Sequence, residues 1–124
     1  VMVIITILAS FAYPSYLRTI THTRRIDGKT ALLELATQME EYYSKNNTYQ
    51  TATIGTGKAN DVRTGHISSE GWYTIEIVEQ TDSSYTLQAT AIKAQAANDP
   101  QCQNLTLNNL GVKSPQSEGS LSCW

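Results

Sequence analysis

The fold of this protein is decided by residues 1–47, whose sequence is VMVIITILASFAYPSYLRTITHTRRIDGKTALLELATQMEEYYSKNN. The beginning of this stretch is apolar except at Thr6 and Ser10, and the first charged residue is Arg18. Further along, apolar residues recur at three- and four-residue steps, which predicts an amphipathic helix. No turn signal separates the two parts. We therefore expect one long helix whose second part packs on a domain and whose first part is buried by other molecules.

The apolar residues 1–13 extend about 20 Å as a helix, less than the ~30 Å hydrocarbon core of a bilayer. This segment has three possible interpretations. The core of a signal peptide has the right length, but neither a basic start nor a cleavage site is visible. A buried core helix would need a large protein around it. We favour the outer part of a membrane segment whose first part precedes this sequence.

Pro14 lies inside the predicted helix and cannot donate a hydrogen bond to the carbonyl of Ser10, so a kink or local melting is expected there. Thr6 and Ser10 are mediocre helix formers and should loosen the same stretch. The alternative is that Pro14 simply marks a helix boundary.

Charges are graded along the helix, with a basic zone followed by an acidic one. The members of the two zones are Arg18, Arg24, Arg25 and Lys29, then Glu34, Glu40 and Glu41. The simpler interpretation is a solvated face with pairs four residues apart. The alternative is that staggered neighbouring chains place one basic zone against another acidic zone. On that hypothesis, charge reversal at Arg24 and Arg25 impairs assembly without unfolding the head.

The rest of the chain, 48–124, is predicted to be a globular head. Residues 48–71 lack periodicity and are expected to form a long loop. Alternating apolar residues over 72–92 predict a β-hairpin, and a second short hairpin is expected around 105–113. The predicted fold class is therefore α+β, with a helix over 1–47 (apolar over 1–13, amphipathic over 14–47) laid on an antiparallel sheet of about four strands.

Cys102 and Cys123 are the only cysteines of the chain. A metal site would need more ligands, and His22 and His66 are distant in sequence. We therefore expect a disulfide that closes residues 102–123, stabilises the head by about 3 kcal/mol and places it in an oxidising compartment.

Composition argues against several classes of function. The formal net charge is −2 and the isoelectric point is near 5.6, which does not favour bulk electrostatic binding of nucleic acid. The basic positions of the head that could contact DNA are scattered: Lys58, Arg63, His66 and Lys113. The sequence contains no phosphate-binding glycine loop, metal motif or nucleophile elbow, so we expect neither an enzyme nor a cofactor.

Two stretches carry a resemblance to a known family. The run from ITILASFAYPSYL through EEYYSKNNTY resembles the N-terminal half of type IV pilins, including the Tyr13-Pro14-Ser15-Tyr16 motif. The later stretch LTLNNLGVKS, followed by the cysteine pair that encloses the D-region, is similar to the E-type pilins of bacterial type IV pilus systems.

This resemblance implies a pilin fold and a subunit of a surface filament. It implies that copies of the chain or related pilins are its partners, that the pilus assembly machinery handles it, and that it resides in the inner membrane before assembly. The filament core would include Val1, Val3, Ile4, Ile5, Ile7, Leu8 and Phe11. The methylated Phe and the Glu at the start of family members have no counterpart here, and we expect roughly eight residues to precede this sequence.

Two further functions remained open. A minor pilin at the filament tip could bind DNA or a surface ligand. A pseudopilin of a type II secretion system is less favoured, because those proteins commonly lack the cysteine pair and often bind calcium. Asp61, Asp82 and Asp99 form no calcium-loop pattern.

Overall fold

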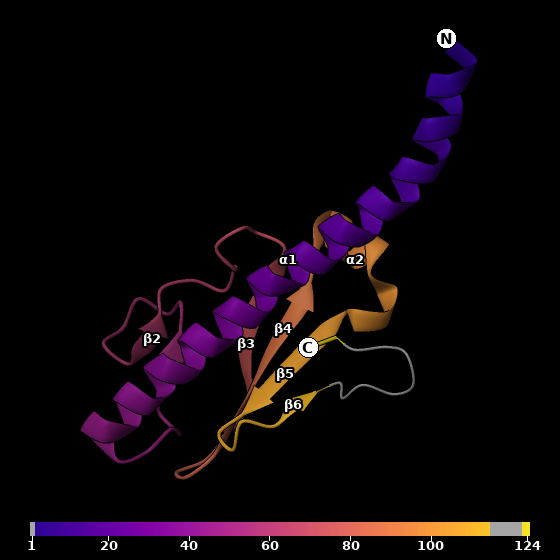
Figure 1. Ribbon diagram of the computed structural model, residues 1–124. Coiled ribbons are helices and arrows are strands. Elements are labelled where there is room, and N and C mark those ends of the chain that lie inside the picture. Colours follow the sequence, from indigo (N-terminus) through magenta and orange to yellow (C-terminus); the bar gives the residue numbers. More distant parts are fainter. Residues whose placement is uncertain (1, 115–122) are drawn as a thin grey trace.

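The computed structural model describes residues 2–114 and 123–124, and its side chains are described except at residues 2, 9 and 11–15. A single long helix, α1 (Met2–Asn46), crosses the whole molecule. One part of α1 lies along a four-stranded sheet and the other projects away from it (Figure 1). The predicted α+β architecture of a helix on an antiparallel sheet is confirmed.

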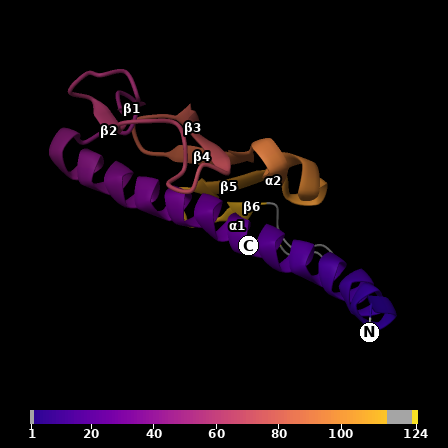
Figure 2. The same cartoon turned by 90° about the horizontal axis from the view of Figure 1, so that it is seen from above.

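Helix α1 packs on the sheet through the second part of its sequence. Ala31, Leu32, Leu35 and Met39 recur on one side of the helix and are buried in the core. The helix ends where Asn47 adopts a left-handed conformation (φ 57°) and donates its backbone N–H to the carbonyl of Tyr43 at 2.7 Å. Seen from above, the sheet covers only this part of α1 (Figure 2).

The projecting part of α1 is helical without interruption, and it is curved (Figure 1). The helix continues through Pro14, so the alternative of a helix boundary there is wrong, and the backbone shows no melted turn. The Ser10 hydroxyl donates to the carbonyl of Ile7 at 2.7 Å, a local bond that favours bending rather than unwinding. The side chain of Pro14 lies outside the described part. Within the described residues, no helix has a stretch that is both long and apolar enough to cross a membrane.

The sheet has the order β3-β4-β5-β6, and all its pairs are antiparallel. Its strands are β3 (Tyr73–Gln80), β4 (Tyr85–Ala91), β5 (Asn104–Asn108) and β6 (Lys113–Ser114). Both predicted hairpins are therefore confirmed. Alternation along the strands places Tyr73, Ile75, Leu87 and Leu105 against α1, with no exposed surface.

Two parts of the head differ from the prediction. Residues 48–71 contain β1 (Thr53–Ile54) and β2 (Asp61–Arg63), which pair in parallel. The Asp61 carboxylate organises this turn by accepting hydrogen bonds from the hydroxyls of Thr53 and Thr56 at 2.6 Å and from the Gly57 amide at 2.7 Å. After β4, the short helix α2 (Lys93–Asn98) and a 3₁₀ turn, η1 (Pro100–Cys102), were not expected.

Candidate functional site

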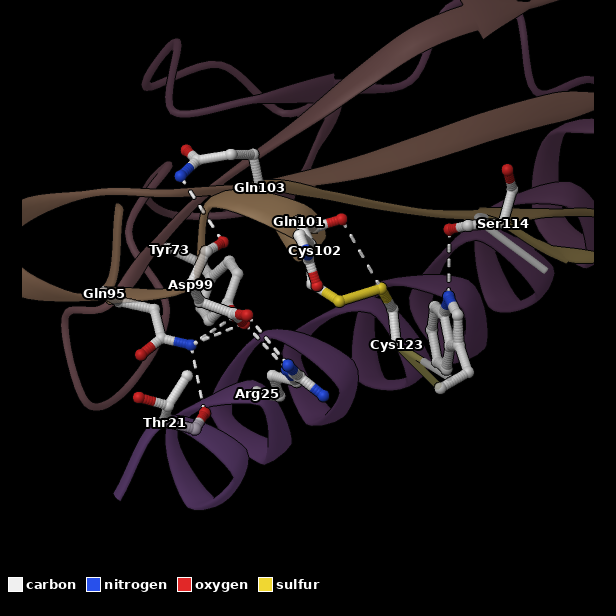
Figure 3. The surroundings of a disulfide bond; sticks show 11 residues. Thr21, Arg25, Tyr73, Gln95, Asp99, Gln101, Cys102, Gln103, Ser114 and Cys123 are labelled. Carbon is white, nitrogen blue, oxygen red and sulfur yellow. Dashed lines mark hydrogen bonds and ion pairs between the residues drawn. A yellow bond between two sulfur atoms is a disulfide. The ribbon is translucent and has the colours of Figure 1, made fainter. Parts of the chain in front are cut away.

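A buried polar network fixes α1 to the head at the point where the helix leaves the sheet. The Arg25 guanidinium donates to both carboxylate oxygens of Asp99, at 2.7 and 2.8 Å, and the two side chains are only 14% and 5% exposed. The Gln95 amide donates to Asp99 at 3.2 Å and to the Tyr73 hydroxyl at 3.0 Å (Figure 3). The hydrogen bond to Asp99 raises the pKa of Arg25, so the guanidinium stays protonated.

Two residues further along α1, Asp27 provides a second attachment. The buried Asp27 carboxylate accepts hydrogen bonds from the Ser68 hydroxyl and from the Glu70 and Trp72 amides, the last two at 3.0 and 3.2 Å. Beside it, Gly28 lies against the Tyr73 ring so closely that a Cβ atom would meet ring carbons at 3.0 Å. Together these residues bring α1 into direct contact with the start of β3.

The predicted disulfide between Cys102 and Cys123 is present, with Cα atoms 5.6 Å apart. Both cysteines are buried, and Cys102 lies in η1, three residues after Asp99 (Figure 3). The bond therefore holds the end of the chain against the same region that receives Arg25.

Next to the disulfide lies a set of residues that we call the C-terminal basic face: Lys29, Lys113 and Trp124. The Lys113 ammonium lies 5.4 Å from the centre of the Trp124 ring, and the indole N–H donates to the carbonyl of Ser114 at 3.0 Å. Burial and the neighbouring charges of Arg25 and Lys113 lower the pKa of Lys29. These residues combine positive charge with an aromatic ring, as nucleic-acid sites do.

The sequence had predicted only one member of this face, Lys113, as a contact for DNA. Trp124 was missed, although a tryptophan directly after a disulfide-bonded cysteine was a usable signal. The other predicted positions do not join Lys113. Arg63 donates to the carbonyls of Gly65 and Ile67, at 3.1 and 2.9 Å, and His66 lies against Gly55.

The predicted charge zones divide between side chains that bind residues of the head and side chains that point to solvent. Glu40 accepts hydrogen bonds from the hydroxyls of Tyr49 and Tyr85, at 3.0 and 3.3 Å, and the Arg24 guanidinium stacks 3.8 Å above the Trp72 ring. Arg18 and Glu41 remain exposed, and the carboxylate of the exposed Glu34 lies 3.9 Å from the Arg63 guanidinium. Because Arg25 is held by Asp99, the expectation that its reversal leaves the head folded has to be corrected.

The projecting part of α1 exposes large apolar side chains. Val3 is 71% exposed and Leu8 is 64% exposed, and Ile4, Ile5 and Ile7 are similarly uncovered. Val1 and the side chain of Phe11 lie outside the described part. A contiguous apolar surface of this kind marks a site of contact with other molecules.

The molecule has the fold of a type IV pilin. It is similar to a type IV pilin from Shewanella oneidensis at 24% identity and a TM-score of 0.56, over 84% of this chain and 97% of that chain. It is also similar to the non-core minor pilin PilV of Neisseria meningitidis at 25% identity and a TM-score of 0.54, over 83% and 95% of the two chains.

Residues 14–106 match the model of the family described as type IV minor pilin ComP, DNA uptake sequence receptor. This match spans more than half of the chain, and the chain belongs to that family. No curated protein sequence matches it.

Proposed function

We propose that this chain is a minor-pilin type of subunit that assembles into a type IV pilus through the projecting part of α1. The observation that supports this most directly is the exposure of Val3, Ile4, Ile5, Ile7 and Leu8, which lie on a part of α1 that no other described residue covers. Such a surface is stable only in lipid or among similar helices. The chain would reside in the inner membrane before assembly and at the bacterial surface afterwards.

On assembly, the apolar surface of α1 would leave the lipid of the membrane and pack against the helices of neighbouring subunits. Packing that repeats without closing produces a filament rather than a ring. The neighbours would be copies of this chain or related pilins, moved from the membrane by the assembly machinery.

The test of assembly is a charge placed within the apolar surface. Ile5→Lys should strongly reduce the amount of the chain recovered in filaments sheared from cells, because a lysine cannot be buried unpaired in a helix bundle. Leu110→Lys is the matched control, since Leu110 is an exposed apolar residue of the head. Equal recovery of both variants would contradict the proposal.

A second candidate function is capture of DNA by the head. The family description names a DNA uptake sequence receptor, and the C-terminal basic face places two lysines and a tryptophan together. With a net charge of −2, contact with DNA would have to be local to such a face rather than spread over the molecule.

This candidate is tested by binding of the purified chain to short DNA duplexes at several salt concentrations. Lys29→Ala/Lys113→Ala should weaken binding and reduce the salt slope by about 2, because each lysine would contact one phosphate. Lys45→Ala, at the end of α1, is the control. Absence of binding at low salt would exclude the DNA function and leave assembly unaffected.

A further inference from the structure

A groove lies where α1 leaves the head, between α1 and the end of helix α2 (Figure 1). It has a volume of about 600 Å³, and we call it the neck groove. Residues of the membrane-proximal helix and of the head both contribute to its lining, so a ligand in the groove would contact the two parts of the molecule at once. The residues that matter for binding are Arg18, His22 and Arg25 of α1 together with Asn98 and Asp99.

The neck groove has an excess of positive charge. Arg25 and Asp99 are bonded to each other at 2.7 and 2.8 Å, so this pair adds no net charge. Asp99 is the only acidic residue in the described lining, and Arg18 is exposed beside it. The exposed Glu70 at the same end of the head lines a different hollow, next to Trp72. The charge of Arg18 is therefore not neutralised within the groove, and the groove suits an anion.

The position of Arg18 along α1 matches the headgroup layer of a membrane. The apolar segment covers residues 1–13, and the sequence contains no acidic residue before Asp27. At about 1.5 Å per residue, Arg18 lies about 8 Å beyond that segment, and lipid headgroups form a layer about 5–8 Å thick on each side of the hydrocarbon core. Tyr16 is 62% exposed at the same level, where aromatic residues commonly flank membrane segments. A chain held in a membrane by residues 1–13 thus brings the neck groove to the headgroups.

We propose that the neck groove binds the headgroup phosphate of an anionic phospholipid while the chain resides in the inner membrane. The inference rests on the membrane residence that forms part of the proposed function. Arg18 supplies a planar guanidinium that pairs with two phosphate oxygens. The exposed His22, one turn further along the same side of α1, donates a second hydrogen bond from its ring.

The lining also distinguishes between headgroups. An ethanolamine headgroup carries an ammonium group that needs an acidic partner, and the Asp99 carboxylate is already held by Arg25 and Gln95. A glycerol headgroup carries hydroxyls instead, for which the amide of the exposed Asn98 is a suitable partner. The groove therefore favours phosphatidylglycerol. Release of this lipid would then accompany the transfer of the chain from the membrane to a filament.

The first experiment measures lipid retention by native mass spectrometry of the full chain, released from micelles that contain equal amounts of phosphatidylglycerol and phosphatidylcholine. The wild-type chain should retain phosphatidylglycerol in preference. Arg18→Gln should weaken retention about tenfold, because a charge-assisted hydrogen bond is lost. Lys93→Gln is the matched control, since it removes an exposed positive charge at the same end of the head, outside the lining. Equal retention of the two lipids by the wild type, or of phosphatidylglycerol by the wild type and Arg18→Gln, would overturn the proposal.

The second experiment distinguishes a lipid from a free anion. Dihexanoyl-phosphatidylglycerol and inorganic phosphate are added at equal concentration as competitors of the retained phosphatidylglycerol. The short-chain lipid should displace it, whereas inorganic phosphate should not, because it lacks the glycerol and acyl parts that contact the groove and the adjoining apolar helix. Equal displacement by inorganic phosphate would overturn the assignment to a lipid.

Fractionation of cells that express the full chain separates failure of this inference from failure of the proposed function. Absence of the wild-type chain from the inner membrane would overturn both together. If the wild-type chain is found in the inner membrane and in sheared filaments, a negative result in the lipid experiments would overturn the headgroup site alone.

Discussion

Asp99 and Arg25 lie 74 residues apart in sequence and form a buried ion pair with two hydrogen bonds. A pair of this kind depends on both members, because removing one leaves the other charge buried without a partner. No local pattern in the sequence connects the two residues, so the pair could not be predicted. Charge alone places Arg25 in the basic zone of α1 together with Arg18, Arg24 and Lys29.

We expect Asp99→Ala to lower the free energy of unfolding by about 3 kcal/mol, as found for broken buried pairs. The measurement is urea unfolding of the purified chain in mild detergent. Replacing both residues by apolar ones, Arg25→Met/Asp99→Leu, should recover much of this loss. A loss below about 1 kcal/mol for the single variant would show that the pair is not buried as described.

The ionisation of Tyr49 and Tyr85 should make the free energy of unfolding depend on pH in the alkaline range. Burial and the hydrogen bond to Glu40 raise the pKa of Tyr49 to about 12, and burial also raises the pKa of Tyr85. In the unfolded chain both ionise near pH 10, as ordinary tyrosines do. Their contribution to the free energy of unfolding is therefore complete below about pH 10 and is lost as the pH rises toward about 12.

Ultraviolet absorbance of tyrosinate during alkaline titration should show these two rings ionising only as the head unfolds. Tyr49→Phe should reduce the loss of stability above about pH 10, and Tyr16→Phe, outside the cluster, is the control. If Tyr49 ionised as readily as free tyrosine in the folded chain, the described packing against Glu40 would be wrong.

At the scale of elements, the alternation of apolar residues predicted the hairpin of β3 and β4 to within one residue of its bounds, because β4 and the first part of β3 bury every second side chain. The parallel pair β1 and β2 could not be found in this way, since strands of two and three residues show no period. Helix α2 has six residues and is held by contacts of Gln95 with α1 and β3, so its existence depends on tertiary packing.

The meeting of α1 and β3 at Gly28 gives a prediction in which two effects oppose each other. Alanine in place of a helical glycine normally gains up to about 1 kcal/mol. Here the new Cβ would press on the Tyr73 ring, which is fully buried and fixed by Gln95. Overpacking of this kind costs about 1–3 kcal/mol, so we expect Gly28→Ala to be destabilising overall.

Thermal unfolding of the purified chain measures this balance. Thr30→Ala is the matched control, because Thr30 is exposed on the same helix and its replacement should change stability by less than about 0.5 kcal/mol. A Gly28→Ala chain more stable than the wild type would mean that the helix can move away from the sheet at little cost.

At the scale of the whole molecule, one part of α1 buries its apolar side chains against the sheet, whereas the projecting part leaves its apolar side chains exposed. Sequence alone predicted this difference, because it follows from composition. The sequence could not locate the C-terminal basic face, because that face depends on the disulfide, which brings the end of the chain back to Lys113. Nor could it separate the internal charges of α1 from the exposed ones.

The uncovered apolar surface predicts self-association when detergent is removed. Ile4→Lys/Leu8→Lys should shift the purified chain toward the monomer in sedimentation experiments while leaving the unfolding temperature of the head unchanged. The reason is that both residues lie outside the core. Undiminished association of this variant would locate the contact in the head instead.

The unbroken course of α1 has a mechanical consequence. Tension applied to its projecting part travels along continuous helix and enters the head first at Thr21, Arg25 and Asp27. Because the helix lies lengthwise on the sheet, such a load acts in shear on all the contacts between them rather than peeling them apart one by one. The residues that fix the helix to the head are thus placed where a pulled fibre would first strain its subunit.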